Sequence, residues 1–335
     1  MSRARAVRAA GRRGAGAPPA EARLRTVVFA YHTIGARALE ALLARREDVI
    51  AVVTHADDPG EGDWFESVAG LARAHRLPCL TPSSPNRPEL IDALRPLAPD
   101  LLLSVWYRRL LGPALLALPR VAALNLHGSL LPRYRGRAPL NWVLVNGEER
   151  TGVTLHHMNE AADAGDIVAQ RPIDIAPDDT ALTLYQRMVK EGVDLLLETL
   201  PAVVAGTAPR VPQDHARATT VGRRRPEDGR IEWTWPAVRI ANMIRAVTHP
   251  FPGAFAGDGS ARLWLWAGSP LPEAPHAALP GTLLEIVAGR GVTVATGVGA
   301  LLLTRVQSGG GAEEPADAWA TYRRLRPGMR LTEVA

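Results

Sequence analysis

Short apolar runs alternate with amphipathic segments between residues 26 and 127. Residues 26–31 form an apolar run that predicts a buried strand, and the apolar positions of residues 34–44 recur on one side of a predicted helix. The same pattern predicts further strands at residues 50–55, 77–80, 100–106 and 121–127, and further helices at residues 64–75, 89–94 and 111–118. Strands that are apolar throughout and separated by helices indicate a mostly parallel α/β sheet, doubly wound with helices on both faces.

The pattern changes in the second half of the chain. A long helix is predicted at residues 180–204, and a polar, arginine-rich segment follows that reads as a linker over residues 214–229. Beyond it, short strands predicted at residues 262–266, 282–287, 291–296 and 300–306 are separated by Pro and Gly. We therefore expect an α/β domain over residues 25–213 and a small, β-rich, barrel-like (OB-like) domain over residues 230–335.

Residues 1–24 differ in composition from the rest of the chain. They contain six arginines and one glutamate, so they account for the whole formal net charge of +5 and leave a neutral body. A neutral body argues against binding nucleic acid through a broad positive field. The segment is acid-poor, like an organelle-targeting presequence, but contains only one serine; a disordered extension and a start codon assigned too early are the other interpretations.

Cysteine content and hydropathy narrow the class of protein further. The single cysteine, Cys79, cannot form an internal disulfide, and the sequence has no apolar run long enough to span a membrane. We therefore expect a cytoplasmic protein without membrane insertion. The Gly-x-Gly-x-x-Gly motif is absent after the first predicted strand, where residues 31–35 read Tyr-His-Thr-Ile-Gly, so a nicotinamide dehydrogenase is not favoured.

Two polar side chains stand at the end of the strand predicted at residues 121–127. Asn125 and His127 alternate with leucines, so both polar side chains face one side of the strand. An amide can donate to the oxyanion that forms when a carbonyl is attacked, and an imidazole can move a proton. Asp163 follows another predicted strand, at residues 152–157, and could orient the imidazole.

Each of these residues also has a simpler interpretation. A single Asn or His at a strand end can be a structural hydrogen-bonding group, and Ser129 lacks the Gly-x-Ser-x-Gly context of a hydrolase nucleophile. His156 and His157 are neighbours on a predicted strand, so their side chains point to opposite faces and do not favour a zinc site. We expect no metal. The residues alone leave open whether this set is catalytic.

A longer motif supports the catalytic interpretation. Residues 125–132 read Asn-Leu-His-Gly-Ser-Leu-Leu-Pro, and residues 162–165 read Ala-Asp-Ala-Gly. This combination resembles the 10-formyltetrahydrofolate-dependent formyltransferases, which act on methionyl-tRNA, phosphoribosylglycinamide or nucleotide sugars. Residues 26–305 are particularly similar to the formyltransferase domains of bifunctional polymyxin-resistance enzymes, through Arg-Gly-Arg-Ala-Pro-Leu-Asn-Trp at residues 135–142 and Gly-Val-Thr-Leu-His at residues 152–156.

The resemblance implies a Rossmann-like formyltransferase fold and a role for each motif residue. Asn125 would stabilise the tetrahedral oxyanion, His127 would donate and accept the proton, and Asp163 would favour the protonated form of His127. The formyl donor, 10-formyltetrahydrofolate, would be bound by two loops and a turn, whose residues are Arg109, Leu110, Leu111, Arg137, Asn159, Glu160, Ala161, Ala162 and Asp163.

The resemblance also implies an acceptor. Arg137 and the Leu-Asn-Trp of residues 140–142 favour the nucleotide sugar UDP-4-amino-4-deoxy-L-arabinose, and with it a role in lipid A (lipopolysaccharide) modification and polymyxin resistance. Initiator methionyl-tRNA is the alternative acceptor, which the neutral body disfavours. A non-enzymatic folate- or nucleotide-binding protein is the third interpretation. The chain ends before the decarboxylase domain of the bifunctional enzymes, so we expect that step in a separate protein; the oligomeric state is not predicted.

Overall fold

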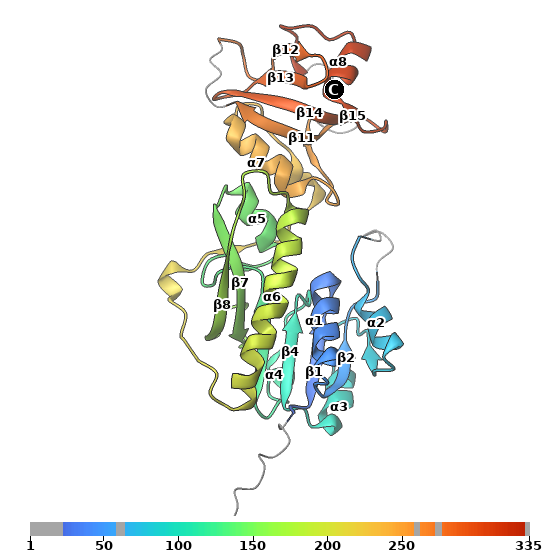
Figure 1. The fold of residues 1–335 in the computed structure, drawn as a ribbon, viewed down its shortest axis with the longest axis vertical. Coiled ribbons are helices and arrows are strands. Elements are labelled where there is room, and N and C mark those ends of the chain that lie inside the picture. The colour runs from blue at the N-terminus through green and yellow to red at the C-terminus, as the bar shows by residue number, and fades with distance from the viewer. Residues whose placement is uncertain (1–22, 58–63, 258–261, 272–276, 332–335) are drawn as a thin grey trace, which may run out of the picture.

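The computed structural model describes residues 23–57, 64–257, 262–271 and 277–331. The molecule is elongated, with an α/β part at one end and an antiparallel β-sheet at the other (Figure 1). Between them meet α5 (Pro139–Val145), α6 (Ala181–Val204) and α7 (Ala237–Val247). The extension predicted over residues 1–24 falls, up to residue 22, outside the described residues.

A seven-stranded sheet forms the centre of the α/β part, in the order β3-β2-β1-β4-β5-β7-β8. The strands are β1 (Thr26–Ala30), β2 (Val49–Val53), β3 (Cys79–Leu80), β4 (Leu101–Val105), β5 (Ala122–His127), β7 (Arg150–His157) and β8 (Ile167–Asp174). The strands from β3 to β5 are parallel, whereas β7 and β8 run antiparallel to their neighbours. The mostly parallel sheet is confirmed. β8 was not among the predicted strands, because it lies at the edge of the sheet and its buried residues are interspersed with exposed ones.

Alternate residues of the central strands face two helical layers. In β1, Val28 and Ala30 belong to the apolar cluster that includes α1 (His32–Ala44) and α6. Val27 and Phe29 belong to the cluster that includes α3 (Pro88–Leu94) and α4 (Pro113–Leu116). All of these β1 side chains are fully buried. Burial on both faces explains the apolar strands and leaves the carboxyl ends of the parallel strands as the place for polar groups.

Local capping sets the helix boundaries. α6 starts after Thr180, whose hydroxyl accepts a hydrogen bond from the Thr183 N–H, and it ends where the predicted helix ends. α2 (Val68–Ala74) begins later than the predicted residue 64, because the Ser67 hydroxyl caps it by accepting from the Gly70 N–H at 2.9 Å. A cap therefore fixes a helix start that apolar periodicity places only approximately.

The C-terminal part is built on an antiparallel sheet in the order β10-β11-β14-β13-β12, with β15 paired to β14. Its strands are β10 (Ala254–Ala256), β11 (Leu263–Leu271), β12 (Leu283–Val287), β13 (Gly291–Ala295), β14 (Ala300–Ser308) and β15 (Glu314–Pro315). α7 packs against β11, and α8 (Ala316–Tyr322) packs against β13 and β14. The β-rich C-terminal part is confirmed, and α7 and α8 are additions to the predicted elements.

The segment predicted as a linker lies against the α/β part. Residues 214–229 contain η3 (His215–Arg217), β9 (Thr220–Val221) and η4 (Pro226–Gly229). β9 pairs in parallel with β6 (Arg135–Gly136), which belongs to the loop after β5. The sequence does not reveal this pairing, because a strand of two residues has no periodicity.

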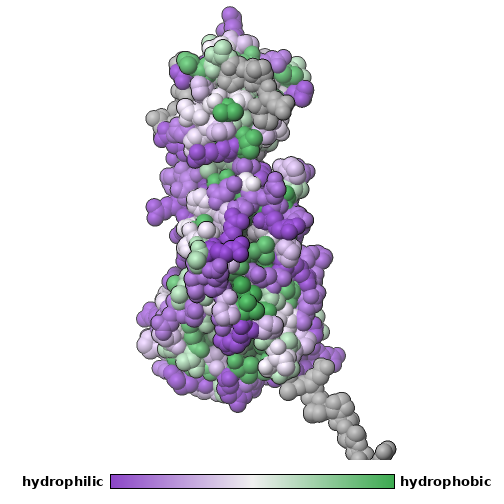
Figure 2. All heavy atoms as spheres, turned by 90° about the vertical axis from the view of Figure 1, so that its left-hand side faces the viewer, coloured by the Kyte–Doolittle hydropathy of each residue, from purple (hydrophilic) through white to green (hydrophobic). Residues whose placement is uncertain are grey.

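On the face seen in Figure 2, hydrophilic side chains prevail around the junction of the two parts, and apolar side chains form small separate areas (Figure 2). No helix within the described ranges has the length and hydropathy needed to cross a membrane.

Candidate active site

Asn125 and His127 lie at the carboxyl end of β5. Because they are two residues apart on a strand, their side chains share one face of the sheet. His127 is buried and Asn125 is half-buried. Leu124 and Leu126 point the other way, into the apolar cluster that includes α6. The alternation of β5 thus brings an amide and an imidazole to one point of the sheet.

His156 on β7 lies directly across from Asn125 in the antiparallel pairing of β5 and β7. Nδ1 of His156 donates to the carbonyl of His157 at 2.8 Å, so in the neutral ring Nε2 carries a lone pair. That lone pair accepts a hydrogen bond from Nδ2 of Asn125 at 3.1 Å. The Asn125 amide is therefore held with its N–H groups on the side of His156 and Asp163, the latter at 3.4 Å.

Asp163 reaches the site from the turn after β7. Its backbone φ is +52°, in the left-handed region. Two residues later, a Cβ on Gly165 would lie 1.9 Å from the His157 carbonyl oxygen, so only glycine fits there. This close approach folds the turn back, and the Oδ2 atom of Asp163 accepts a hydrogen bond from the Gly136 N–H at 2.8 Å.

The carboxyl group of Asp163 is held in its charged form. Burial opposes its ionisation, but the neighbouring imidazoles of His127 and His156 and the Gly136 N–H outweigh burial and hold the pKa of Asp163 well below its usual range. Its Oδ1 atom lies 3.5 Å from Nδ1 of His127 and 3.5 Å from Nε2 of His156. One carboxylate oxygen thus faces the nitrogen atoms of both imidazoles and of the Asn125 amide.

The loop after β5 fixes the ring of His127. Nε2 of His127 donates to the Tyr134 carbonyl at 2.8 Å, which leaves Nδ1 facing Asp163. The Ser129 hydroxyl is fully buried and donates to the carbonyls of Arg133 and Tyr134, at 2.7 and 3.2 Å. Ser129 is therefore a structural residue of this loop, and its geometry gives no support to a nucleophilic role.

A buried pair, Arg135 and Gln213, supports the turn that carries Asp163. Nε2 of Gln213 donates to the carbonyls of Asp163 and Gly165, at 2.9 and 2.7 Å. Oε1 of Gln213 accepts from Nε and Nη2 of Arg135, at 3.1 and 2.6 Å. Gln213 stands 50 residues after Asp163 and in no recognisable motif, so the sequence does not point to it.

The loop of residues 109–111, predicted to bind folate, follows β4. Asn86 holds this loop from both sides: Oδ1 accepts from the Gly112 N–H at 2.6 Å, and Nδ2 donates to the Leu110 carbonyl at 3.0 Å. The Leu110 side chain is 64% exposed, whereas Leu111 is buried. The loop therefore presents an apolar side chain to solvent on a fixed backbone.

The two other segments predicted to bind folate border the same site. Arg137 reaches the loop after β4, because its Nη2 donates to the Arg108 carbonyl at 2.6 Å. In the turn of residues 159–163, Oδ1 of Asn159 accepts from the Ala161 N–H at 3.1 Å, and the turn ends at Asp163. The structure thus joins Arg137 to the residue before the 109–111 segment, and it joins the turn to the catalytic candidates.

Taken together, these groups suit chemistry at a carbonyl. Asn125 offers N–H donors, His127 a proton position at Nδ1, and Asp163 a fixed negative charge beside it. Such a set can stabilise an oxyanion and transfer a proton. Across the described part of the chain, no three His, Cys, Asp or Glu side chains are grouped so that they could hold a metal ion.

The fold is that of a formyl-transferring enzyme. Residues 24–200 match the family model described as formyl transferase, and residues 224–324 match the one described as formyl transferase, C-terminal domain. The chain belongs to the formyl transferase family. Its α/β sheet with an antiparallel C-terminal part is the formyltransferase fold that the motif implies.

Solved structures share this fold at low sequence identity. An N-formyltransferase from Helicobacter canadensis, in complex with folinic acid and dTDP-3-aminofucose, is 18% identical with a TM-score of 0.67, over 84% of this chain and 99% of that chain. HypX from Aquifex aeolicus, in complex with tetrahydrofolic acid, is 20% identical with a TM-score of 0.60 over 89% of this chain. The match covers 47% of HypX, so this chain spans about half its length. A methionyl-tRNA formyltransferase from Clostridium thermocellum is 16% identical with a TM-score of 0.51, over 73% of this chain and 92% of that chain.

Proposed function

We propose that the chain transfers the formyl group of 10-formyltetrahydrofolate to the amine of a nucleotide-linked amino sugar. The observation that carries the proposal is the convergence of Asn125, His127 and Asp163, with distances of 3.4 Å from Nδ2 of Asn125 and 3.5 Å from Nδ1 of His127 to one carboxylate oxygen. Contacts of this length are typical of an active site without its substrates, and they tighten when the reacting groups bind.

In the mechanism that we propose, Asn125 acts on the oxygen atom of the formyl group, and His127 acts on the two nitrogen atoms between which the formyl group moves. The acceptor amine attacks the formyl carbon, and an N–H of Asn125 stabilises the oxyanion that forms. The N–H that lies 3.4 Å from Asp163 can turn to the oxyanion, while the other remains bonded to His156. One C–N bond forms to the acceptor as the bond from carbon to N10 of the folate breaks.

His127 would move the proton that this exchange requires. Its Nδ1 takes a proton from the attacking amine and returns it to N10, so that tetrahydrofolate leaves with a neutral nitrogen. Nε2 stays bonded to the Tyr134 carbonyl throughout and keeps the ring in place. Asp163, 3.5 Å from Nδ1, stabilises the imidazolium midway through the reaction.

The folate donor would lie along the loop of residues 109–111, Arg137 and the turn of residues 159–163. Two observations support this assignment. Arg137 is bonded to the carbonyl of Arg108, the residue before the first segment, and its neighbour Gly136 is bonded to Asp163, with which the last segment ends. The HypX and Helicobacter canadensis structures contain tetrahydrofolic acid and folinic acid, respectively.

A nucleotide-linked amino sugar is the acceptor that we favour. The Helicobacter canadensis enzyme contains dTDP-3-aminofucose, and the body of this chain, beyond residue 24, carries no net charge with which to attract a polynucleotide. Our first candidate is UDP-4-amino-4-deoxy-L-arabinose, which would place the protein in lipid A modification and polymyxin resistance.

A transfer assay tests both halves of the proposal. The protein is incubated with 10-formyltetrahydrofolate and, separately, UDP-4-amino-4-deoxy-L-arabinose, dTDP-3-aminofucose or initiator methionyl-tRNA, and release of tetrahydrofolate is followed. Transfer to a sugar alone is the expected result. Transfer to the tRNA alone, with an affinity that falls steeply as salt is raised, would overturn the acceptor and retain the chemistry. Absence of transfer to all three would remove the support for the acceptor class.

A further inference from the structure

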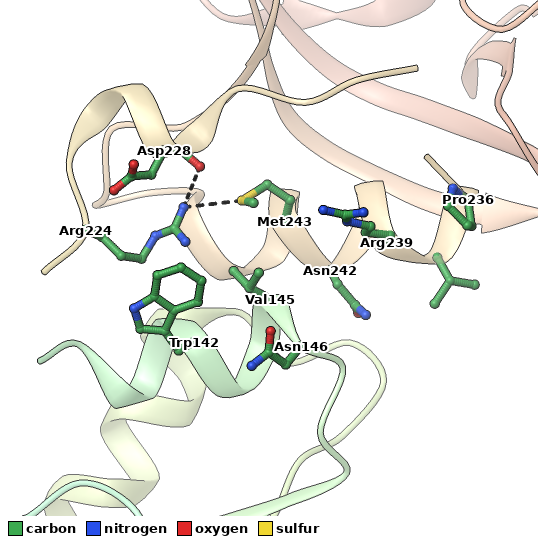
Figure 3. A pocket seen from close by; sticks show the side chains of 10 residues that line it. Trp142, Val145, Asn146, Arg224, Asp228, Pro236, Arg239, Asn242 and Met243 are labelled. Atoms are coloured by element: carbon green, nitrogen blue, oxygen red, sulfur yellow. Dashed lines mark hydrogen bonds between the residues drawn. The ribbon is translucent and has the colours of Figure 1, made fainter. Parts of the chain in front are cut away.

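A cleft of about 680 Å³ opens where α5, the segment around η4, and α7 meet (Figure 3). Trp142 and Asn146 line it from α5 and the residue after it, Arg224 from the segment before η4, and Arg239 and Asn242 from α7. None of the residues assigned to catalysis lines this cleft. Its place between the two parts of the molecule is typical of ligand sites.

Arg224 brings a poorly compensated positive charge to the cleft. Its guanidinium lies over the Trp142 ring, 4.8 Å from the centroid, and Nη2 donates to the Asp228 carbonyl at 2.7 Å and contacts Met243 Sδ at 3.4 Å. The Asp228 carboxylate is already bonded to the Arg225 N–H at 2.6 Å. Burial lowers the pKa of Arg224, and the charge of Asp228 offsets this only in part.

Arg239 adds a second guanidinium on the α7 side (Figure 3). It is exposed and lies over the Trp235 ring, 3.9 Å from the centroid. Within the described residues, neither Arg239 nor Arg224 forms an ion pair with a carboxylate. Two such guanidinium groups around one cleft favour an anion, and their planar donors suit phosphate in particular.

The remaining walls suit a flat heterocycle. Trp142, Val145 and Met243 supply apolar surface. Nδ2 of Asn146 is bonded to the Tyr134 hydroxyl at 3.0 Å, which leaves its amide oxygen as an acceptor. Oδ1 of Asn242 accepts from Nε of Arg245 at 2.9 Å, which leaves its NH₂ group as a donor. One acceptor and one donor match the edge of uracil or thymine, which offers an N–H and two carbonyl oxygens.

The same chain segments connect the cleft with the catalytic candidates. The N–H of Gly136 holds Asp163, and α5 begins only three residues later. Trp142 therefore lies no more than about 15 Å from Gly136, by the reach of an extended chain and the rise of a helix. On the other side, β6 pairs with β9, and the carbonyl of Gly222, the residue after β9, accepts from Nε1 of Trp142 at 2.9 Å.

We infer that this cleft binds the nucleoside diphosphate end of the acceptor, with the base against Trp142 and the diphosphate on Arg224 and Arg239. The inference rests on the proposed function, because it assigns the part of the acceptor that does not react. Bound in this way, the diphosphate directs the sugar along the start of α5 toward Asn125 and His127. A folate glutamate tail, which is also anionic, has no flat ring to occupy the apolar wall or the two amides.

Direct binding of UDP and dTDP tests the cleft without catalysis. Each nucleotide is titrated calorimetrically into the wild-type protein and into Arg224→Gln, Arg239→Gln and Arg223→Gln, with no folate or amine present. The first two substitutions are expected to weaken binding about tenfold or more, because each removes a charge-assisted hydrogen bond. Arg223 is exposed, stands next to Arg224 and does not line the cleft, so Arg223→Gln is expected to bind as wild type does.

The exposed position of Arg239 keeps this test independent of folding. If Arg224→Gln lowers the melting temperature, Arg239→Gln alone decides, and wild-type affinity in that variant overturns the inference. Failure of the wild-type protein to bind either nucleotide overturns it as well. In steady-state assays the two variants should raise KM for the amino sugar and leave KM for 10-formyltetrahydrofolate unchanged. A rise in KM for the folate, or for methionyl-tRNA, instead assigns the cleft to another ligand and overturns the inference.

The formyl-transfer assay and the nucleotide titration together separate this inference from the proposed function. If wild-type protein transfers no formyl group to any amino sugar, the proposed function fails, yet the nucleotide titration still reports on the cleft. If transfer occurs and the Arg224 and Arg239 variants match wild type in binding and in KM, the function stands and the inference fails.

Discussion

The main-chain N–H of Gly136 donates a hydrogen bond of 2.8 Å to the carboxylate of Asp163, and this bond joins the loop after β5 to the turn after β7. The other oxygen of Asp163 faces the amide of Asn125 and the imidazole of His127. Asp163, which stands 27 residues after Gly136, is thereby fixed beside Asn125 and His127, both of which lie on β5. The order of the site depends on contacts between loops as much as on the strand itself.

Replacing Asn125 or His127 by alanine should nearly abolish formyl transfer. Loss of an oxyanion donor lowers rates by about 10²–10³, and loss of a positioned acid/base group lowers them by about 10²–10⁴. The measurement is kcat with 10-formyltetrahydrofolate and the amino sugar, alongside far-UV circular dichroism. His75→Ala is the control, because His75 is exposed at the end of α2. A near-wild-type kcat in either site variant would refute its assignment.

His156 should act through Asn125 rather than on the substrate. His156→Leu removes the acceptor of the 3.1 Å bond from Asn125, so the amide can rotate and kcat is expected to fall about 10-fold with little change in KM. The double variant Asn125→Ala/His156→Leu should be no slower than Asn125→Ala alone, because the amide that His156 holds is already gone. A double variant whose loss of kcat equals the combined losses of the two single variants would show that His156 acts independently of Asn125.

Gln213 should support the turn of Asp163. Gln213→Leu leaves the carbonyls of Asp163 and Gly165 without this donor and the guanidinium of Arg135 with only its contact to His215. The cost is about 1–3 kcal/mol for each buried group that loses its partner. We expect a lower melting temperature and a kcat reduced about 10-fold. Gln186→Leu, at an exposed position of α6, is the matched control. Unchanged stability and kcat in Gln213→Leu would rule out this support.

The sequence predicts the sheet well where packing alone decides it. The central strands are apolar because both faces are buried, and Asn125 and His127 interrupt that pattern visibly at the end of β5. α7 also carries a readable signal, since Ile240, Ile244 and Val247 recur at helical spacing and are buried. α5 carries no such signal, because its seven residues form a short apolar run that fits a strand as well as a helix.

Tertiary contacts that periodicity cannot express supply the rest of the site. His156 meets Asn125 only through the register of an antiparallel pair, and no local pattern fixes that register. Gln213 meets Asp163 only because residues 214–229, which read as a linker by composition, pack back and pair with β6. The cleft lined by Arg224 and Arg239 likewise exists only once α5 and α7 meet.

The charge of Asp163 should make its contribution to stability depend on pH. Its pKa is depressed in the folded protein, so the unfolded chain binds the proton more readily. The resulting stability is fully present above the ordinary Asp pKa of about 3.9 and is lost as pH falls from there toward the depressed folded value. Asp163→Asn removes this contribution, so its melting temperature should lie below that of wild type by a clear interval at about pH 5. Below about pH 4 the interval should shrink, because wild type loses the charge as well.

Scanning calorimetry of both proteins in a buffer series measures this interval, with Asp92→Asn, at an exposed position of α3, as the control that should show no interval at any pH. An interval that stays constant down to about pH 2 would mean that Asn fails for reasons of packing alone, since a steric defect has no proton to lose. The same series tests catalysis. Without the charge 3.5 Å from Nδ1, the imidazolium of His127 loses its stabilising partner, and kcat of Asp163→Asn should fall at every pH at which wild type is active.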